Sequence, residues 1–172
     1  SPKAQARNSA TSGSENCQQA GSLDYRAIGE TGLAVNFHGC EMDMNLSMDG
    51  GFEFTAANLS TAPLINITYK NLHIKMTDYT DSVQDLNDTI NGTFSMAFAS
   101  SAQTNFTTIQ NLVRTDNQTG VTVESKQVNL SYGSYGLMPT AASGTLNHST
   151  HGDVSLAMQE KALIIKGETS TL

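Results

Sequence analysis

The residues with the clearest capacity for chemistry are soft metal ligands around Cys40. Met42, Met44 and Met48 follow Cys40 at alternate positions, and His38 precedes it. Thioether, thiolate and imidazole groups together would favour Cu(I). The same spacing is also typical of the buried face of a β-strand, where methionine fills irregular gaps in a core. Since a disulfide at Cys40 would remove its thiolate, we expect these sulfur atoms to belong to a core and not to a copper site.

A second candidate is the sequence around His148, His151 and Asp153. Two histidines three residues apart could share a metal ion in a turn, and a nearby carboxylate could complete a zinc site. This spacing has low specificity, and histidines are common in exposed turns. We therefore expect no metal here, and no other cofactor.

Seven acidic residues form two groups, one on the strand after Cys40 and one in a polar connection. They are Glu41, Asp43 and Asp49, and Asp78, Asp81, Asp85 and Asp88. Paired carboxylates can bind Ca²⁺ or hydrolyse glycosides. No calcium-loop spacing is present, so a solvated strand face and a polar loop are the simpler interpretation.

Other catalytic and binding patterns are absent from the sequence. There is no G-x-S-x-G motif, no phosphate-binding glycine loop, and no specific partner for any of the four histidines. The net charge is -7 without any run of Lys and Arg, which argues against a nucleic-acid partner. No apolar run approaches the roughly 20 residues of a membrane-spanning helix. We expect a protein without catalytic residues, nucleic-acid partner or transmembrane segment.

Cys17 and Cys40 are the two cysteines of the chain. Cys17 follows a polar segment rich in Ser, Asn and Gln, and Cys40 opens a strand. In an exported protein this pair would form a disulfide. The alternative is two unpaired thiols, one exposed and one in the core.

Alternating apolar and polar residues predict that β-strands position all of these side chains. Leu33, Val35 and Phe37 alternate on odd positions and the residues from Cys40 onward on even ones, which predicts a β-bulge at residues 38–39. A similar change predicts a second bulge near residues 70–71, and the parity changes once more between residues 123 and 128. The Asp49-Gly50-Gly51 sequence is typical of a hairpin turn.

About ten such strands follow one another, most of them joined by short turns, with no convincing helix. This order predicts an all-β antiparallel meander of about ten strands, forming a barrel, a half-barrel or a sandwich, and a curved open sheet fits equally well. Residues 1–16 lack periodic apolar residues and are predicted to be a flexible leader. Residues 17–172 are predicted to form a single β-domain.

The motif N-x-S/T occurs nine times. The asparagines are Asn45, Asn58, Asn66, Asn87, Asn91, Asn105, Asn117, Asn129 and Asn147. In a eukaryotic secreted protein these would be glycan acceptors. Strands with an outer face of Asn, Ser and Thr produce the same triplets automatically, and we favour this structural interpretation.

Several short motifs together resemble a loose group of exported bacterial all-β domains of unknown function. The motifs are Cys17 followed by Gly21, the Phe-His-Gly-Cys sequence ending at Cys40, Met48-Asp49-Gly50, and Asn91-Gly92-Thr93. The resemblance spans roughly residues 17–100. It implies a periplasmic or cell-surface location, with any lipid anchor upstream of Ser1, and it implies no functional site.

These observations favour a non-enzymatic interaction or scaffold module of the cell envelope, with an unknown protein or envelope component as partner. Its contact surface would be the polar sheet face or an unpaired sheet edge. The alternative is a carrier that binds a lipid-like or other apolar ligand within a curved sheet. The residues that would line its cavity, or simply form the core, are Met42, Met44, Met48, Phe52, Phe54, Phe94, Met96 and Phe98.

Overall fold

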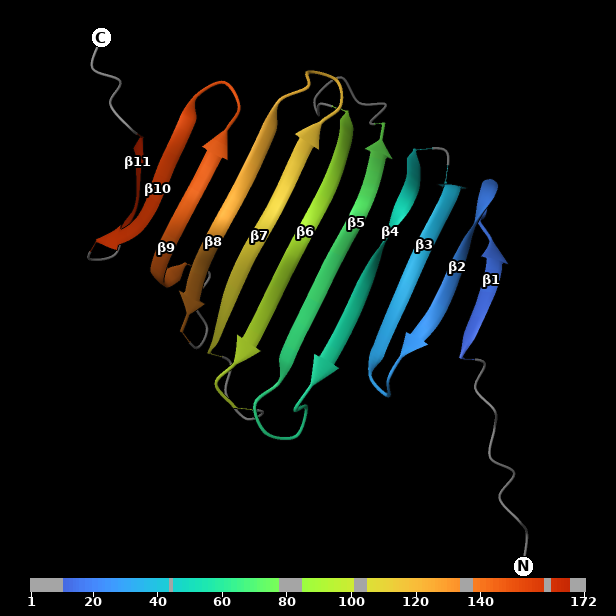
Figure 1. Ribbon diagram of the computed structural model, residues 1–172, viewed down its shortest axis with the longest axis horizontal. Coiled ribbons are helices and arrows are strands. Elements are labelled where there is room, and N and C mark those ends of the chain that lie inside the picture. Colours follow the sequence, from blue (N-terminus) through green and yellow to red (C-terminus); the bar gives the residue numbers. More distant parts are fainter. Residues whose placement is uncertain are drawn as a thin grey trace, which may run out of the picture.

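The computed structural model describes residues 11–43, 45–77, 85–100, 105–133, 138–159 and 162–167. Eleven antiparallel strands form one sheet, in which the order of the strands is their order in the chain (Figure 1). The strands are β1 Ser12–Asn16, β2 Ala20–Ile28, β3 Gly32–Glu41, β4 Leu46–Ala57, β5 Leu64–Met76, β6 Leu86–Phe98, β7 Phe106–Asp116, β8 Thr122–Tyr132, β9 Pro139–His148, β10 Gly152–Gln159 and β11 Ala162–Gly167. The predicted antiparallel meander is confirmed, but the sheet is not closed into a barrel, and β1 and β11 are its edges.

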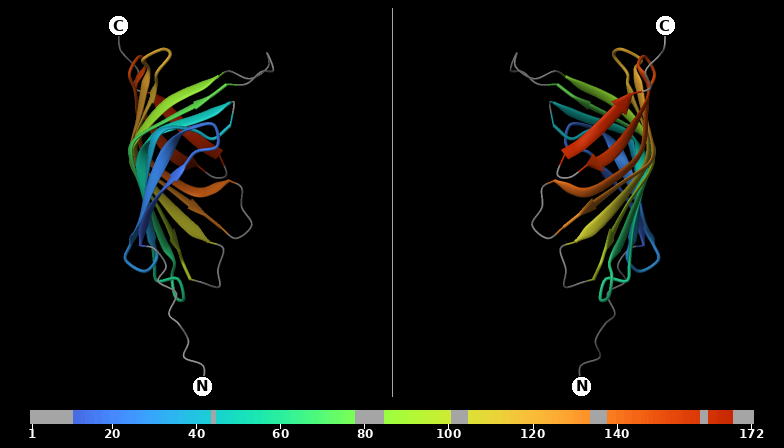
Figure 2. Two further views of the ribbon diagram at one scale, coloured as in Figure 1. Left: turned by 90° about the vertical axis from the view of Figure 1, so that its right-hand side faces the viewer. Right: turned by 90° about the vertical axis from the view of Figure 1, so that its left-hand side faces the viewer.

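The sheet is a single curved layer (Figure 2). Its strands make their extensive contacts with their sheet neighbours alone. The chain exposes 11721 Å² to solvent, whereas a compact monomer of this size would expose about 8,100 Å². Among the described residues only four apolar side chains are buried, namely Phe37, Cys40, Leu72 and Val128. Most of the apolar face is therefore only half-buried.

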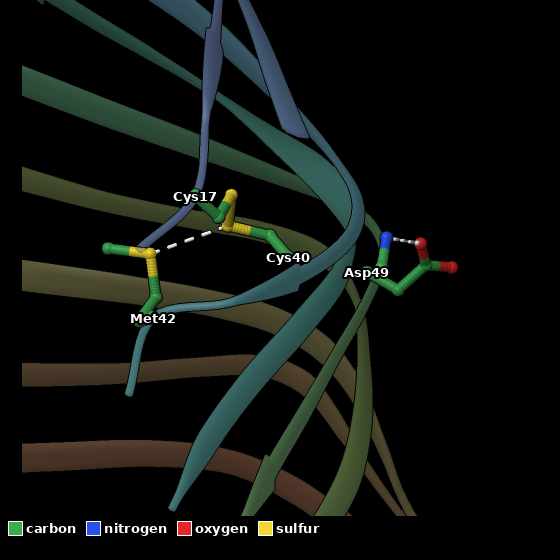
Figure 3. Close-up of a disulfide and its surroundings, with 5 residues drawn as sticks. Cys17, Cys40, Met42 and Asp49 are labelled. Atoms are coloured by element: carbon green, nitrogen blue, oxygen red, sulfur yellow. Dashed lines mark hydrogen bonds between the residues drawn. A yellow bond between two sulfur atoms is a disulfide. The ribbon is translucent and has the colours of Figure 1, made fainter. Parts of the chain in front are cut away.

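The best-packed part of this face surrounds the disulfide between Cys17 and Cys40, which confirms the predicted bridge. The Cα atoms of the two residues are 5.5 Å apart, and Cys40 is fully buried with Phe37 and Leu72. Leu23, Val35, Met42, Met48, Phe52, Tyr69 and Ile74 pack against these residues. Figure 3 shows the disulfide on the inner side of the bend in the strands, and Asp49 on the outer side.

The strands bend along a row of residues that crosses the sheet, which we call the bend row. It comprises Gly21, Gly39, Gly50, Asn71, Gly92, Asn111, Gln127 and Gly144. All of them except Asn111 have a positive φ. Register shifts at Phe37/Cys40 and Tyr69/Leu72 confirm the two predicted bulges. A third shift, at Lys126/Asn129, lies where the sequence changes parity once more. Bulges and glycine kinks at matching positions curve a sheet.

Each bulge in the bend row is held from both neighbouring strands. On one side, the carbonyl oxygen of the bulged residue lies against a glycine, as Asn71 O does against Gly50. On the other side, its backbone N–H donates to an Asp or Asn side chain. Asn71 N donates to Asn91 Oδ1 (2.6 Å), and equivalent bonds join Gly39 N to Asp49 and Gln127 N to Asn111. The bulged N–H groups, which leave the regular ladder, thus keep an acceptor.

Two predictions about the elements differ from the structure. Asp49-Gly50-Gly51 is not a hairpin turn, because β4 runs through it and the chain reverses between Glu41 and Leu46 instead. Gly50 has a φ of 78° and lies opposite the bulge at Asn71. A glycine at such a position gives the same sequence signal as a glycine in a turn. Strand β1 lies inside the predicted leader. The sequence pattern does not reveal it, because an exposed edge strand needs no alternating apolar residues. Residues 1–10 of the leader lie outside the described part.

Candidate functional site

The candidate site is a groove of about 600 Å³ on the polar face of β1 to β5. The sheet register places two rows of its lining side chains on this face. One row is Ser12, Arg26, Ala34 and Glu53, and the other is Ser14, Asp24, Asn36, Gly51 and Lys70. Ala34 and Gly51 have little or no side chain, which leaves room above β3 and β4 between the longer polar residues.

Glu53 joins two cations at one side of the groove. Arg26 Nη2 donates to Glu53 Oε1 at 3.0 Å, and Lys70 Nζ donates to the same oxygen at 2.6 Å. The hydrogen bond from Lys70, together with the positive charges of Lys70 and Arg26, lowers the pKa of Glu53. The side chain of Glu53 is 26% exposed, while those of both cations are more than half exposed. Two cations around one carboxylate leave a local excess of positive charge.

Asp24 forms the second polar cluster of the groove. Its Oδ2 lies 2.8 Å from His38 Nε2, which is also 3.2 Å from Asn36 Nδ2. Hydrogen bonds from Ser14 and His38 lower the pKa of Asp24. The groove therefore has cationic groups at Arg26 and Lys70, and an ionised carboxylate on β2.

No motif in the sequence marks this groove. Its residues come from five strands, and they meet only because the register aligns them across the sheet. The one signal available in the sequence is the small size of Ala34 and Gly51 at polar-face positions of long strands.

The structure separates the proposed copper ligands. Cys40 is in a disulfide, and its Sγ lies 3.4 Å from Met42 Sδ on the apolar face. His38 contacts Asp24 on the polar face instead. Met44 lies outside the described residues. Met42 and Met48 pack against the buried cluster that contains Cys40.

His148 and His151 do come together, with ring centroids 4.6 Å apart. Asp153 lies on the other face of the sheet, where its Oδ1 accepts a hydrogen bond from Asn147 Nδ2. His148 Nδ1 accepts a hydrogen bond from Thr150 N at 3.3 Å. In the described part of the chain, no group of three or more His, Cys, Asp or Glu side chains could hold a metal ion.

Three of the described acidic residues in these two groups, Asp43, Asp49 and Asp88, have local structural partners. Asp43 accepts hydrogen bonds from the backbone of Asn45 and Leu46 in the β3–β4 turn, and Asp49 holds the bulge at Gly39. Asp88 is buried on the apolar face and forms an ion pair with Arg114. Asp78 and Asp81 lie outside the described residues.

Several asparagines of the N-x-S/T motifs take part in cross-strand hydrogen bonds. Asn66 accepts a hydrogen bond from Ser95, and Asn91 accepts one from the backbone of Asn71. Asn147 donates a hydrogen bond to Asp153. These contacts agree with the structural interpretation of the motif.

The described members of the predicted apolar set lie on one face of the sheet, and Met44 is outside the described residues. Met42, Met48 and Phe52 pack around the disulfide. In the sheet register, Phe54 lies opposite Ile67, Ile67 lies opposite Phe94, and Phe98 lies opposite Phe106. These side chains are half-buried. This curved apolar surface is the second candidate site.

In comparisons with known proteins, no family model, no curated protein and no solved structure matches the chain. In the part of the chain that the structure describes, no helix is long and apolar enough to span a membrane.

Proposed function

We propose that this chain is a non-enzymatic interaction module of an exported assembly, and that the groove across β1 to β5 is its contact surface for a partner protein. The observation that carries the proposal is the groove of about 600 Å³, in which small residues leave space between paired charges. The Cys17–Cys40 disulfide is consistent with an oxidising, exported location. Resemblance to exported bacterial β-domains supports the cell envelope as the setting.

At one side of the groove, the two cations around Glu53 favour a partner segment with an acidic side chain. Arg26 and Lys70 share one acceptor, Glu53 Oε1, and both remain largely exposed. A carboxylate from the partner would therefore meet two cations that need little rearrangement to bind it. Because Ala34 and Gly51 have little or no side chain, the partner could approach the backbone of the sheet at these positions.

A photo-crosslinking residue at Ala34 tests this proposal in the cells that export the protein. We expect a protein adduct with p-benzoylphenylalanine at Ala34, and its loss when Arg26→Glu is added. The matched control is the same residue at Ala157, an exposed polar-face position of β10 outside the groove. Absence of an adduct at Ala34, or equal adducts at both positions, would reject the groove as the contact surface.

A second candidate function is that of a carrier for an apolar ligand, favoured by the curved apolar face, which none of the described strands covers as a second layer. Native mass spectrometry of protein purified from its own compartment would show an added mass that is lost on denaturation. Protein of the bare mass would reject the carrier and leave the interaction module in place.

A further inference from the structure

Strand β11 presents an apolar edge that the sheet leaves unpaired. In the described part of the chain it pairs with β10 alone, and the sheet ends there (Figure 1). Leu163 and Ile165 continue the apolar face from Met158 and Leu156, and they are 38% and 61% exposed. Soluble proteins commonly protect such an edge with charges, proline or a bulge. Between Ala162 and Gly167 the only such feature is Lys166.

The opposite edge of the sheet is different. Strand β1 has the sequence SGSEN, without an apolar residue. The chain leaving it is also tied to β3 through the disulfide of Cys17. The two edges are therefore not complementary to each other, and head-to-tail pairing of β11 with β1 of another copy would leave Leu163 and Ile165 opposite polar side chains.

Strand β11 is instead complementary to itself. In an antiparallel pair of two β11 strands related by a two-fold axis at Ile164, Ile164 faces its own copy. Leu163 then faces Ile165 of the second copy, and Lys166 faces Ala162. Apolar side chains directly opposite each other stabilise antiparallel strands, and in this register the lysines do not face one another. A two-fold interface uses the same surface on both chains, which this strand offers.

We propose that two copies of this chain associate through their β11 edges, in the antiparallel register centred on Ile164. The dimer joins the two sheets and makes their apolar faces continuous through Leu163 and Ile165. This inference does not rest on the proposed function, because the groove on β1 to β5 lies at the other end of each sheet.

Analytical ultracentrifugation and directed crosslinking of the full chain test the proposal. We expect a dimer at tens of micromolar protein, and a monomer after Ile165→Lys. Ile109→Lys is the matched control, because Ile109 is a similarly exposed isoleucine (42%) on the polar face of β7. A monomer for the unmodified chain, or a dimer that withstands Ile165→Lys, would overturn the proposal.

The register has its own test. Ile164→Cys should give a covalent dimer under mild oxidation, because the two cysteines would face each other across the axis. Ser155→Cys, an exposed polar-face position on neighbouring β10, should give none. Equal crosslinking of the two variants, or failure of Ile164→Cys to crosslink, would overturn the assigned register.

Discussion

At the scale of single residues, Glu53 is the group on which the groove depends most. It accepts hydrogen bonds from Arg26 and Lys70 through one oxygen, on a face where the neighbouring positions Ala34 and Gly51 add no bulk. Removing its charge would leave two cations close together without a shared partner. Glu53 therefore both organises the groove and contributes to the stability of β2, β4 and β5.

The pH dependence of stability should report this contribution. The pKa of Glu53 is lowered from its ordinary value of 4.5, first by the hydrogen bond from Lys70. A carboxyl group with a lowered folded-state pKa stabilises the fold above its unfolded-state pKa, and this stabilisation is lost as the pH falls through the folded-state value. The free energy of unfolding should thus differ most between wild type and Glu53→Gln near neutral pH, and the difference should shrink below about pH 4.5.

Chemical denaturation of both proteins between pH 3 and pH 7 measures this difference. The control is the same Glu53→Gln change in an Arg26→Met, Lys70→Met background, where most of the pH dependence should be absent. A difference that stays constant across the acid range would contradict the assignment.

At the scale of elements, the bend row decides the shape of the strands. Gly50 shows why its residues are restricted: a Cβ atom there would lie 2.0 Å from Asn71 O, and φ is 78°. Gly120, in the β7–β8 turn, has a similar φ of 74° but no atom within 4 Å of the Cβ position. The two glycines thus separate the cost of backbone conformation from the cost of close packing between strands.

Gly50→Ala should therefore destabilise the protein more than Gly120→Ala. Both changes place alanine at positive φ, at a cost of about 1–2 kcal/mol. The clash with β5 should add about 1–3 kcal/mol at Gly50 alone. Urea denaturation measures both variants, and equal losses of stability would show that the carbonyl of Asn71 can move away at little cost.

The alternation of residues was sufficient to predict most of the strands, the meander and two of the bulges, because each of these depends on local parity. It could not distinguish Gly50, which lies opposite the bulge at Asn71, from a glycine in a turn, since both have a positive φ. It also missed β1, whose pairing with β2 is through backbone groups. The groove depends on the register of Asp24, Asn36 and Gly51 across three strands, and no local pattern contains that information.

At the scale of the whole molecule, the fold behaves as a chain of neighbouring strands. Each inner strand is stabilised by the two beside it, and in the described part of the chain no second layer lies across the apolar face. In such an arrangement the stability of the fold is close to the sum of the intrinsic stabilities of the strands and the interaction energies between neighbouring strands. Because an edge strand has one neighbour instead of two, the edges open at the lowest free energy. The two edges are unequal, because the disulfide ties the β1–β2 connection to Cys40 in the best-packed region, whereas β11 pairs with β10 alone among the described strands.

Hydrogen–deuterium exchange should show this asymmetry. We expect the slowest exchange in β4 to β7, intermediate exchange in β1 and β2, and the fastest in β10 and β11 of the dilute protein. Reduction of the disulfide should accelerate exchange in β1 and β2 and leave β6 and β7 unchanged, because the link acts on one edge only. Higher protein concentration should slow exchange in β11 alone, where a second copy would pair. Uniform exchange along the sheet would show instead that the eleven strands open as one cooperative unit.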